Sequence, residues 1–333
     1  MVGSRTTLAM VARDAERCVA CGSERLRFVD GAAIDALAEA WADEQRLRSG
    51  AGRDAATWRH TMESVIDAPV VRFDRCEECG CEVASPRRTW IEGTYPDDER
   101  YPPRWEFQRF VEDLGGTPVS VLELGSGAGT FLSLARERGH RPTGIDFSRG
   151  AVLDARRKGL EAVCGGFEDL RRHLIASGTD RTFDAIGMFH VIEHLTAPSE
   201  MFDELATFAR PGTKLGISCP GPRRFTRLIR EEQVGGRDFW DYPPHHVIRW
   251  TLGGLGRFLQ ARGWRVIRAE EEPLDWVGAA SQVAITRALH RGYVGRVLRK
   301  KLGIVHAMFR VLVARRTLRG LSLYVLAERV GAA

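Results

Sequence analysis

Short apolar runs alternate with stretches of helical spacing along the C-terminal part of the chain. Helical spacing is clearest at 107–114, 198–209 and 251–262. Strands that alternate with helices predict an α/β fold with a doubly wound, Rossmann-like sheet. The runs typical of its seven strands cover residues 119–124, 142–146, 160–164, 183–188, 213–220, 264–269 and 321–326.

The N-terminal part has a different pattern. Apolar residues of 33–47, Trp41 among them, fall on one face of a helix, so an amphipathic helix is expected there. Apolar residues at 65–66 and within 70–73 then favour a return of the chain in extended form. The contrast with the alternating pattern farther along predicts a separate N-terminal module.

A glycine-rich loop follows the first predicted strand. It reads Glu123-Leu-Gly125-Ser126-Gly127-Ala-Gly129, or E-x-G-x-G-x-G, and the next helix begins directly after it. Because the side chains of this loop are small or absent, a ligand can contact the backbone directly at the N-terminal end of that helix, where the helix dipole is positive. The spacing differs from the G-x-G-x-x-G of dinucleotide sites, and an acid before the first glycine favours a cationic ligand over a pyrophosphate.

This loop resembles the first motif of the class I methyltransferases that use S-adenosylmethionine (SAM), a cofactor with a sulfonium and an ammonium group. In this family the seventh strand inserts antiparallel beside the sixth. The resemblance implies that Asp146 binds the ribose hydroxyls and that Phe167 packs on the adenine. The full set of SAM-binding residues that it implies is Glu123, Gly125, Ser126, Gly127, Gly129, Asp146, Phe147, Phe167 and Phe189.

The segment after the fourth predicted strand reads His190-Val-Ile-Glu193-His194. H-x-x-E-H on a helix is the inverted zinc-protease signature. Its position directly after a parallel strand, where such sheets present their ligand sites, favours the methyltransferase interpretation instead. Here His190 is a candidate base and Glu193 orients a histidine or caps a helix. The two together are also candidates for a divalent metal at the active site, as in some ubiquinone-type O-methyltransferases.

A second catalytic candidate lies in Asp241-Tyr-Pro-Pro-His245-His246. Adjacent histidines in an extended chain point in opposite directions, so one of the two is expected to face the cleft, and His245 is favoured. A histidine that titrates near neutral pH is a natural base for a hydroxyl acceptor aligned with the methyl group. A purely structural hydrogen bond is the alternative for each histidine, above all for His194.

Four of the seven cysteines form two C-x-x-C pairs, Cys18 with Cys21 and Cys76 with Cys79, and each pair is followed by glycine. Paired knuckles of this kind supply the four thiolates of a structural zinc site. The gap between the pairs is longer than in ordinary ribbons, which predicts a zinc ribbon with a helical insertion. Disulfides are the alternative, and Cys81 is a spare thiol.

Composition narrows the function classes. The chain has 333 residues, 44% of them hydrophobic, and a net charge of +5. No run approaches the ~18–20 apolar residues that span a bilayer. The first residues lack the apolar core of a signal peptide, so a cytoplasmic location with reduced cysteines is expected.

The region from Trp276 to Ala327 contains no acidic residue but ten arginines and lysines, interleaved with apolar residues. Within it, 277–319 is expected to form a basic helical insertion before the last strand. Three interpretations stay open: peripheral contact of 287–319 with an anionic membrane, a cover over the substrate cleft, and a solvated insertion. A basic patch also suits RNA.

The chain therefore divides into a zinc-binding module at 1–90, a linker with a leading helix at 91–116 and a methyltransferase domain at 117–333. The zinc ribbon, aromatic linker and late Pro-Pro-His-His segment resemble a group of methyltransferases that act on sugars, lipid-linked glycans and secondary metabolites. The predicted function is methyl transfer to a small-molecule, sugar or lipid-linked glycan hydroxyl with a histidine base. An RNA methyltransferase is the alternative, which the modest charge and the lack of an Asn/Asp-Pro-Pro-Tyr/Phe motif disfavour. A third option keeps SAM only as a structural or sensing ligand.

Overall fold

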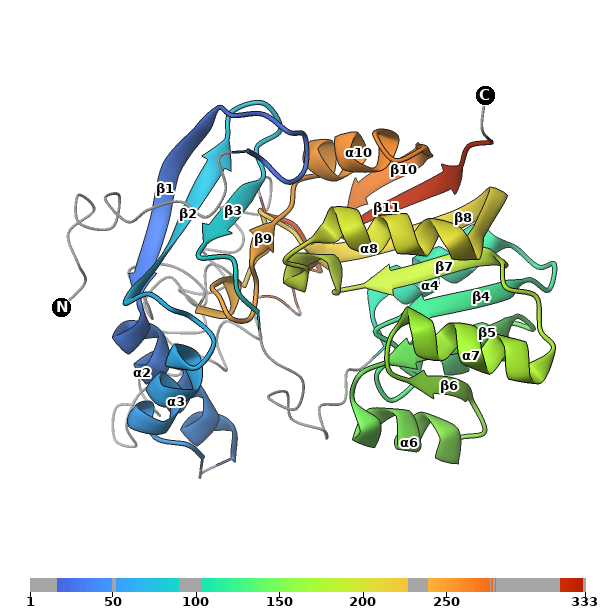
Figure 1. Cartoon of the computed structure of the whole chain (residues 1–333), viewed down its shortest axis with the longest axis horizontal. Coiled ribbons are helices and arrows are strands. Elements are labelled where there is room, and N and C mark those ends of the chain that lie inside the picture. The colour runs from blue at the N-terminus through green and yellow to red at the C-terminus, as the bar shows by residue number, and fades with distance from the viewer. Residues whose placement is uncertain are drawn as a thin grey trace.

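The computed structural model describes residues 17–49, 52–89, 103–226, 239–275, 277, 279 and 318–331. Most of the basic region 277–319 lies outside this range, so its predictions stay predictions. The described chain forms two β-sheets that lie side by side (Figure 1). Among the described helices, none has both the length and the apolar sequence that a membrane crossing requires.

The larger sheet has seven strands in the order β10-β11-β8-β7-β4-β5-β6. The pairs from β8 through β6 are parallel, whereas β11 lies between β10 and β8 and is antiparallel to both. The predicted doubly wound sheet with an antiparallel last strand is therefore confirmed. Its strands are β4 (Ser120–Leu124), β5 (Arg141–Asp146), β6 (Glu161–Cys164), β7 (Phe183–Phe189), β8 (Ala209–Pro220), β10 (Trp264–Glu271) and β11 (Ser322–Arg329).

Helices cover both faces of this sheet and bury two apolar clusters against it (Figure 1). One cluster contains Phe110 and Phe131 and lies under the helices α4, α5 and α6. The other contains Leu174 and Phe202, lies under α7, α8 and α10, and extends into the smaller sheet. These helices are α4 (Trp105–Leu114), α5 (Thr130–Glu137), α6 (Arg149–Arg157), α7 (Phe167–Ser177), α8 (Pro198–Leu205) and α10 (Leu252–Gln260).

The smaller sheet has the order β1-β2-β3-β9. The helix predicted at 33–47 is confirmed as α2, whereas 65–66 lie before the strand instead of within it. Strands β1, β3 and β9 and helix α3 were not predicted. The elements are β1 (Leu26–Ala33), α2 (Ile34–Ser49), α3 (Ala55–Glu63), β2 (Val70–Cys76), β3 (Glu82–Ser85) and β9 (Ile248–Arg249).

Strand β9 joins the two parts of the molecule, because it comes from the segment between β8 and α10 but pairs with β3. The Arg249 guanidinium lies 3.0 Å from Asp30 Oδ2 and 2.8 Å from Glu82 Oε2, and all three side chains are largely buried. It also lies over the Phe73 ring, 3.7 Å from its centroid. The N-terminal module is thus packed directly on the part of the chain that forms the larger sheet, and the division at residues 90 and 116 stays a prediction.

We predict that Arg249→Leu destabilises the protein by about 3–5 kcal/mol, because it leaves two buried carboxylates without their shared cation. Urea denaturation followed by circular dichroism measures the change. Arg265→Leu is the matched control, since it removes an exposed ion pair of 3.2 Å with Glu328 and should cost about 1 kcal/mol or less. Equal losses in both variants would contradict the importance of the buried junction.

Candidate functional site

The glycine loop between β4 and α5 adopts a backbone conformation that most residues avoid. Gly125 has φ of 71° and Gly127 has φ of 50°. A Cβ atom on Gly125 would lie 2.5 Å from Val191 Cγ2, so close packing excludes a side chain there. A Cβ atom on Gly127 would meet nothing within 4 Å, and Gly127 borders a cavity. The backbone at Gly127 is therefore open to a ligand.

Two acidic side chains flank this loop. Asp146, at the end of β5, accepts hydrogen bonds of 2.8 Å from the amides of Gly127 and Ser148. Glu123 is 3% exposed, and its Oε2 atom accepts no hydrogen bond from the described residues. Burial, with the Asp146 charge as a second cause, raises the pKa of Glu123 well above its usual value. A buried carboxyl without a partner, next to a second one, fits a positively charged ligand.

The aromatic residues predicted to hold the cofactor lie in three different settings. Phe189 is buried against Phe107, 5.1 Å between ring centroids, and borders the cavity. Phe147 is 63% exposed, and Phe167 stacks on Phe208 at 5.3 Å. Neither of these two lines the cavity. Their contacts to the cofactor stay predictions.

The cavity has a volume of about 440 Å³, which is typical of small-molecule sites. It lies at the carboxyl ends of β4, β5 and β7, where open α/β sheets bind their ligands. It brings together the loop, the acids and the histidines predicted from the sequence. The predicted residues that line it are Glu123, Gly125, Ser126, Gly127, Asp146, Phe189, His190, Glu193, His245 and His246. His194, for which a structural role was expected, lines it as well.

His190 directly follows β7 and has φ of 56°, in the left-handed region that residues other than glycine rarely adopt. Its Nε2 atom lies 3.0 Å from both Glu106 Oε1 and Ser322 Oγ, and its Nδ1 atom lies 3.2 Å from Glu193 Oε1. Burial lowers the pKa of His190, but the contacts with Glu106 and Glu193 outweigh it, so the pKa is raised. The ring is held from both sides by carboxylates.

Glu106 contacts His190 and was not predicted from the sequence as a residue of the site. It lies in α4, is 1% exposed, and accepts hydrogen bonds of 3.3 Å from the hydroxyls of Ser218 and Ser322. Burial raises its pKa, and His190 more than offsets this, so the pKa is lowered. A signal was present, because Glu106 precedes Phe110 by four residues and shares the apolar face of this helix.

The other three histidines that line the cavity, His194, His245 and His246, form one cluster. His194 Nδ1 lies 2.6 Å from the His245 carbonyl oxygen, and His246 Nδ1 lies 3.1 Å from Asp241 Oδ1. The rings of His245 and His246 stack with their centroids 4.3 Å apart. Burial lowers the pKa of His194 to about 4. One ring nitrogen of each histidine lies within 4.8 Å of those of the other two.

One expectation about these histidines was wrong, and one interpretation that the sequence disfavoured is absent from the structure. The residues from 243 to 245 form a turn instead of an extended chain, and both His245 and His246 therefore border the cavity. The segment with the H-x-x-E-H pattern is not an α-helix, because His190 is left-handed and only Ile192–His194 form a short 3-10 turn. The helical geometry of the inverted zinc-protease signature is absent there.

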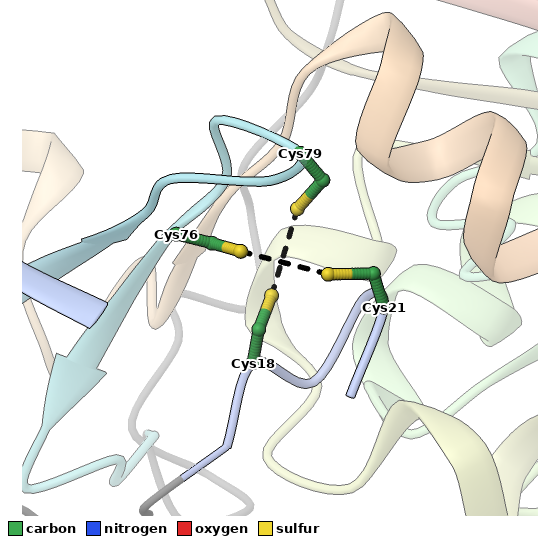
Figure 2. A group of neighbouring side chains, drawn as sticks. All are labelled: Cys18, Cys21, Cys76 and Cys79. Carbon is green, nitrogen blue, oxygen red and sulfur yellow. Dashed lines mark hydrogen bonds between the residues drawn. The ribbon is translucent and has the colours of Figure 1, made fainter. Parts of the chain in front are cut away.

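The four cysteines of the two C-x-x-C pairs point their sulfur atoms at a common centre (Figure 2). Sγ atoms are 3.6 Å apart for Cys18 and Cys79, and 3.5 Å apart for Cys21 and Cys76. Four thiolates at the usual Zn–S distance of about 2.3 Å would be about 3.8 Å apart. No disulfide joins the described cysteines. Cys81 lies outside this group, and its Sγ atom is 3.7 Å from Thr251 Oγ1.

The cysteine group also touches the helix that follows β9. Thr251 Oγ1 donates a hydrogen bond of 2.7 Å to the Cys79 carbonyl oxygen and accepts one of 3.0 Å from Gly254. Thr251 is the N-cap of α10. The second C-x-x-C pair, Cys76 and Cys79, is therefore hydrogen bonded to the first turn of α10, which belongs to the part of the chain with the larger sheet.

Comparison with known proteins identifies what the chain is similar to. A family model described as "Methyltransferase domain" matches residues 98–269. The ubiquinone biosynthesis O-methyltransferase of Aeromonas salmonicida is 29% identical over 112 residues, 33% of this chain and 47% of that protein. That of Hahella chejuensis is 30% identical over 113 residues, with the same coverage of 33% and 47%.

The chain thus spans about half the length of these curated relatives. Among solved structures, a SAM-dependent methyltransferase from Archaeoglobus fulgidus superposes with a TM-score of 0.46 at 18% identity, covering 67% of this chain and 91% of that one.

Proposed function

The chain belongs to the methyltransferase-domain family, and we propose that it transfers the methyl group of SAM to a hydroxyl oxygen of a small molecule. The observation that carries this proposal is the shared cavity, which is lined by the glycine loop, Asp146 and the histidines after β7. A methyltransferase must hold its cofactor and its acceptor in the same cavity, because the acceptor atom attacks the methyl carbon in line with the sulfur–methyl bond that breaks.

The residues around the loop fit a cationic cofactor without phosphates. When bound, SAM supplies a methyl group activated by its sulfonium charge. The Asp146 carboxylate has lone pairs left for ribose hydroxyls beyond its two backbone partners. The Gly127 backbone gives open access, and the unpartnered Glu123 carboxyl favours positive charge nearby. Phe189 closes the apolar wall of the same cavity.

His190 takes the proton of the acceptor hydroxyl in this proposal. As the oxygen–methyl bond forms and the sulfur–methyl bond breaks, the hydroxyl proton passes to the neutral form of the His190 imidazole, whose raised pKa makes it the stronger base. Glu106 and Glu193, at 3.0 and 3.2 Å, then stabilise the imidazolium. To do so, His190 must exchange one of its present partners for the acceptor. His245 is the second candidate, but its ring is stacked against His246.

The acceptor class rests on the relatives and on the cavity. The curated relatives are named as O-methyltransferases of ubiquinone biosynthesis, which favours an oxygen acceptor on a small molecule. A sugar or lipid-linked glycan hydroxyl would use the same chemistry. RNA is the alternative acceptor, and the basic region 277–319 that motivates it lies mostly outside the described residues.

We also propose that Cys18, Cys21, Cys76 and Cys79 hold a structural zinc ion. The support is the spacing of their sulfur atoms, which is close to that of a tetrahedral thiolate site. Four thiolates leave no open position, so such an ion stabilises the fold and takes no part in catalysis.

We predict that Asp146→Ala weakens SAM binding roughly 10- to 150-fold, as expected for a lost hydrogen bond to a charged group of about 1.5–3 kcal/mol. Gly127→Arg should abolish it by filling the cavity. Isothermal titration calorimetry measures both, with the surface variant Asp180→Ala as control. Unchanged affinity in Asp146→Ala and Gly127→Arg would disprove the cofactor assignment.

We predict that His190→Ala lowers the rate of methyl transfer by about 10²–10⁴-fold while SAM affinity is retained. Turnover is measured with radiolabelled SAM and a mixed extract of acceptors, with RNA as a separate arm. His173→Ala is the control, since His173 forms an exposed pair with Glu161 at 2.8 Å. Near-wild-type turnover in His190→Ala would exclude it as the base, and the same assay on His245→Ala then tests the second candidate.

We predict that zinc survives mild chelation in the wild type and in Cys81→Ser but is lost in Cys79→Ser. The reason is that Cys79 belongs to the sulfur group and Cys81 does not. Elemental analysis should find about one retained zinc per chain, as four thiolates bind one ion. Loss of zinc from Cys81→Ser alone would show that the fourth ligand was chosen wrongly.

A further inference from the structure

With His190 as the base, the proposed methyl transfer does not use His194, His245 or His246. All three border the cavity, and one ring nitrogen of each lies within 4.8 Å of those of the others. They come from two segments, the short turn after β7 and the loop before β9. Three imidazole nitrogens this close together can surround a metal ion.

The outer nitrogens of two of these rings have acceptor partners. His194 Nδ1 faces the His245 carbonyl oxygen at 2.6 Å, and His246 Nδ1 faces Asp241 Oδ1 at 3.1 Å. A carbonyl or carboxylate oxygen only accepts, so Nδ1 carries the proton in both rings. In each of these two rings, Nε2 is then the nitrogen whose electron pair can bind a metal ion. This is the usual arrangement of metal-binding histidines, whose other nitrogen donates to an oxygen.

Glu193 supplies a negative charge at the same place. Its Oε1 atom lies 4.0 Å from His194 Nε2 and 4.0 Å from His246 Nε2. The residue is 1% exposed, and neither carboxylate oxygen accepts a well-formed hydrogen bond from the described part of the chain. Its shortest ion-pair contact is with His190 Nδ1, at 3.2 Å. The Nε2 atoms of His194 and His246 and the Glu193 carboxylate therefore lie around one common place.

We propose that His194, His245 and His246 bind a divalent first-row transition-metal ion, with the Glu193 carboxylate beside it. Imidazole and carboxylate donors suit such ions, among them Zn²⁺, Fe²⁺ and Co²⁺. Ligands at about 2.1 Å from a tetrahedral ion are about 3.4 Å apart, so nitrogens up to 4.8 Å apart have to approach one another by up to about 1.4 Å. The sequence suggested His190 as a ligand, but its Nε2 atom is already held by Glu106.

Three histidines leave a coordination position open, unlike four thiolates. Because the three histidines line the cavity, an ion held by them would be accessible to an acceptor oxygen there and would lower the pKa of that hydroxyl. This role rests on the proposed function, whereas binding of the ion does not.

The test is cobalt binding to purified protein that has been dialysed against a mild chelator and retains its thiolate-bound zinc. We expect about one Co²⁺ per chain, with the visible absorption of a nitrogen and oxygen site and no thiolate charge-transfer band. His194→Gln and His246→Gln should each weaken cobalt binding by at least about tenfold, and His173→Gln should not change it.

Circular dichroism and SAM affinity check that these variants are folded. Cobalt uptake accompanied only by a thiolate band, no uptake, or wild-type affinity in both glutamine variants would overturn the proposal. Absence of methyl transfer alone would count against the proposed function and leave the cobalt result standing, so the two failures are distinguishable.

Discussion

The site depends on one buried ionic contact, that of Arg249 with Asp30 and Glu82. Strand β9 has two residues, Ile248–Arg249, too few to form a stable edge by itself. The guanidinium and two ladder pairs, Glu82 with Arg249 and Val83 with Ile248, fix it on β3. The same short strand ends the loop that carries His245 and His246, so the position of these rings is set by the N-terminal module.

Negative charge dominates the cavity, and the protein compensates it unevenly. Glu106 faces His190, and Asp241 pairs with Arg224 and His246. The Oε2 atom of Glu123 has no hydrogen-bond partner among the described residues, and burial raises the pKa of this carboxyl. A buried carboxyl is costly unless something positive approaches it. A cationic cofactor at the loop, and a metal ion beside Glu193, would each supply the missing charge where these carboxylates lie.

The central strands were predictable because parallel strands are buried on both faces and consist of apolar runs, as in 119–124 and 183–188. The smaller sheet was not, since β1 and β3 carry charged residues whose partners come from distant segments, Glu82 with Arg249 for example. The candidate site followed from the loop and the histidines. Glu106 was missed because its partner His190 is 84 positions away. The stacking of His245 on His246 was also missed, because the turn that allows it has no signal beyond two prolines.

The two metal sites proposed for this chain differ both in their ligands, thiolates in one and imidazoles in the other, and in their position relative to the cavity. The sulfur group lies at the first turn of α10, fixed by Thr251, and does not line the cavity. The histidines line it. A continuous set of backbone contacts links the two regions: Ala84 N donates to Val247 O at 2.9 Å, and Val247 N donates to Glu193 O at 2.9 Å. Loss of zinc would loosen β3 first, and through Val247 the loosening would reach Glu193 and its histidines. A closed thiolate site can thus stabilise an open imidazole site without contacting the substrate.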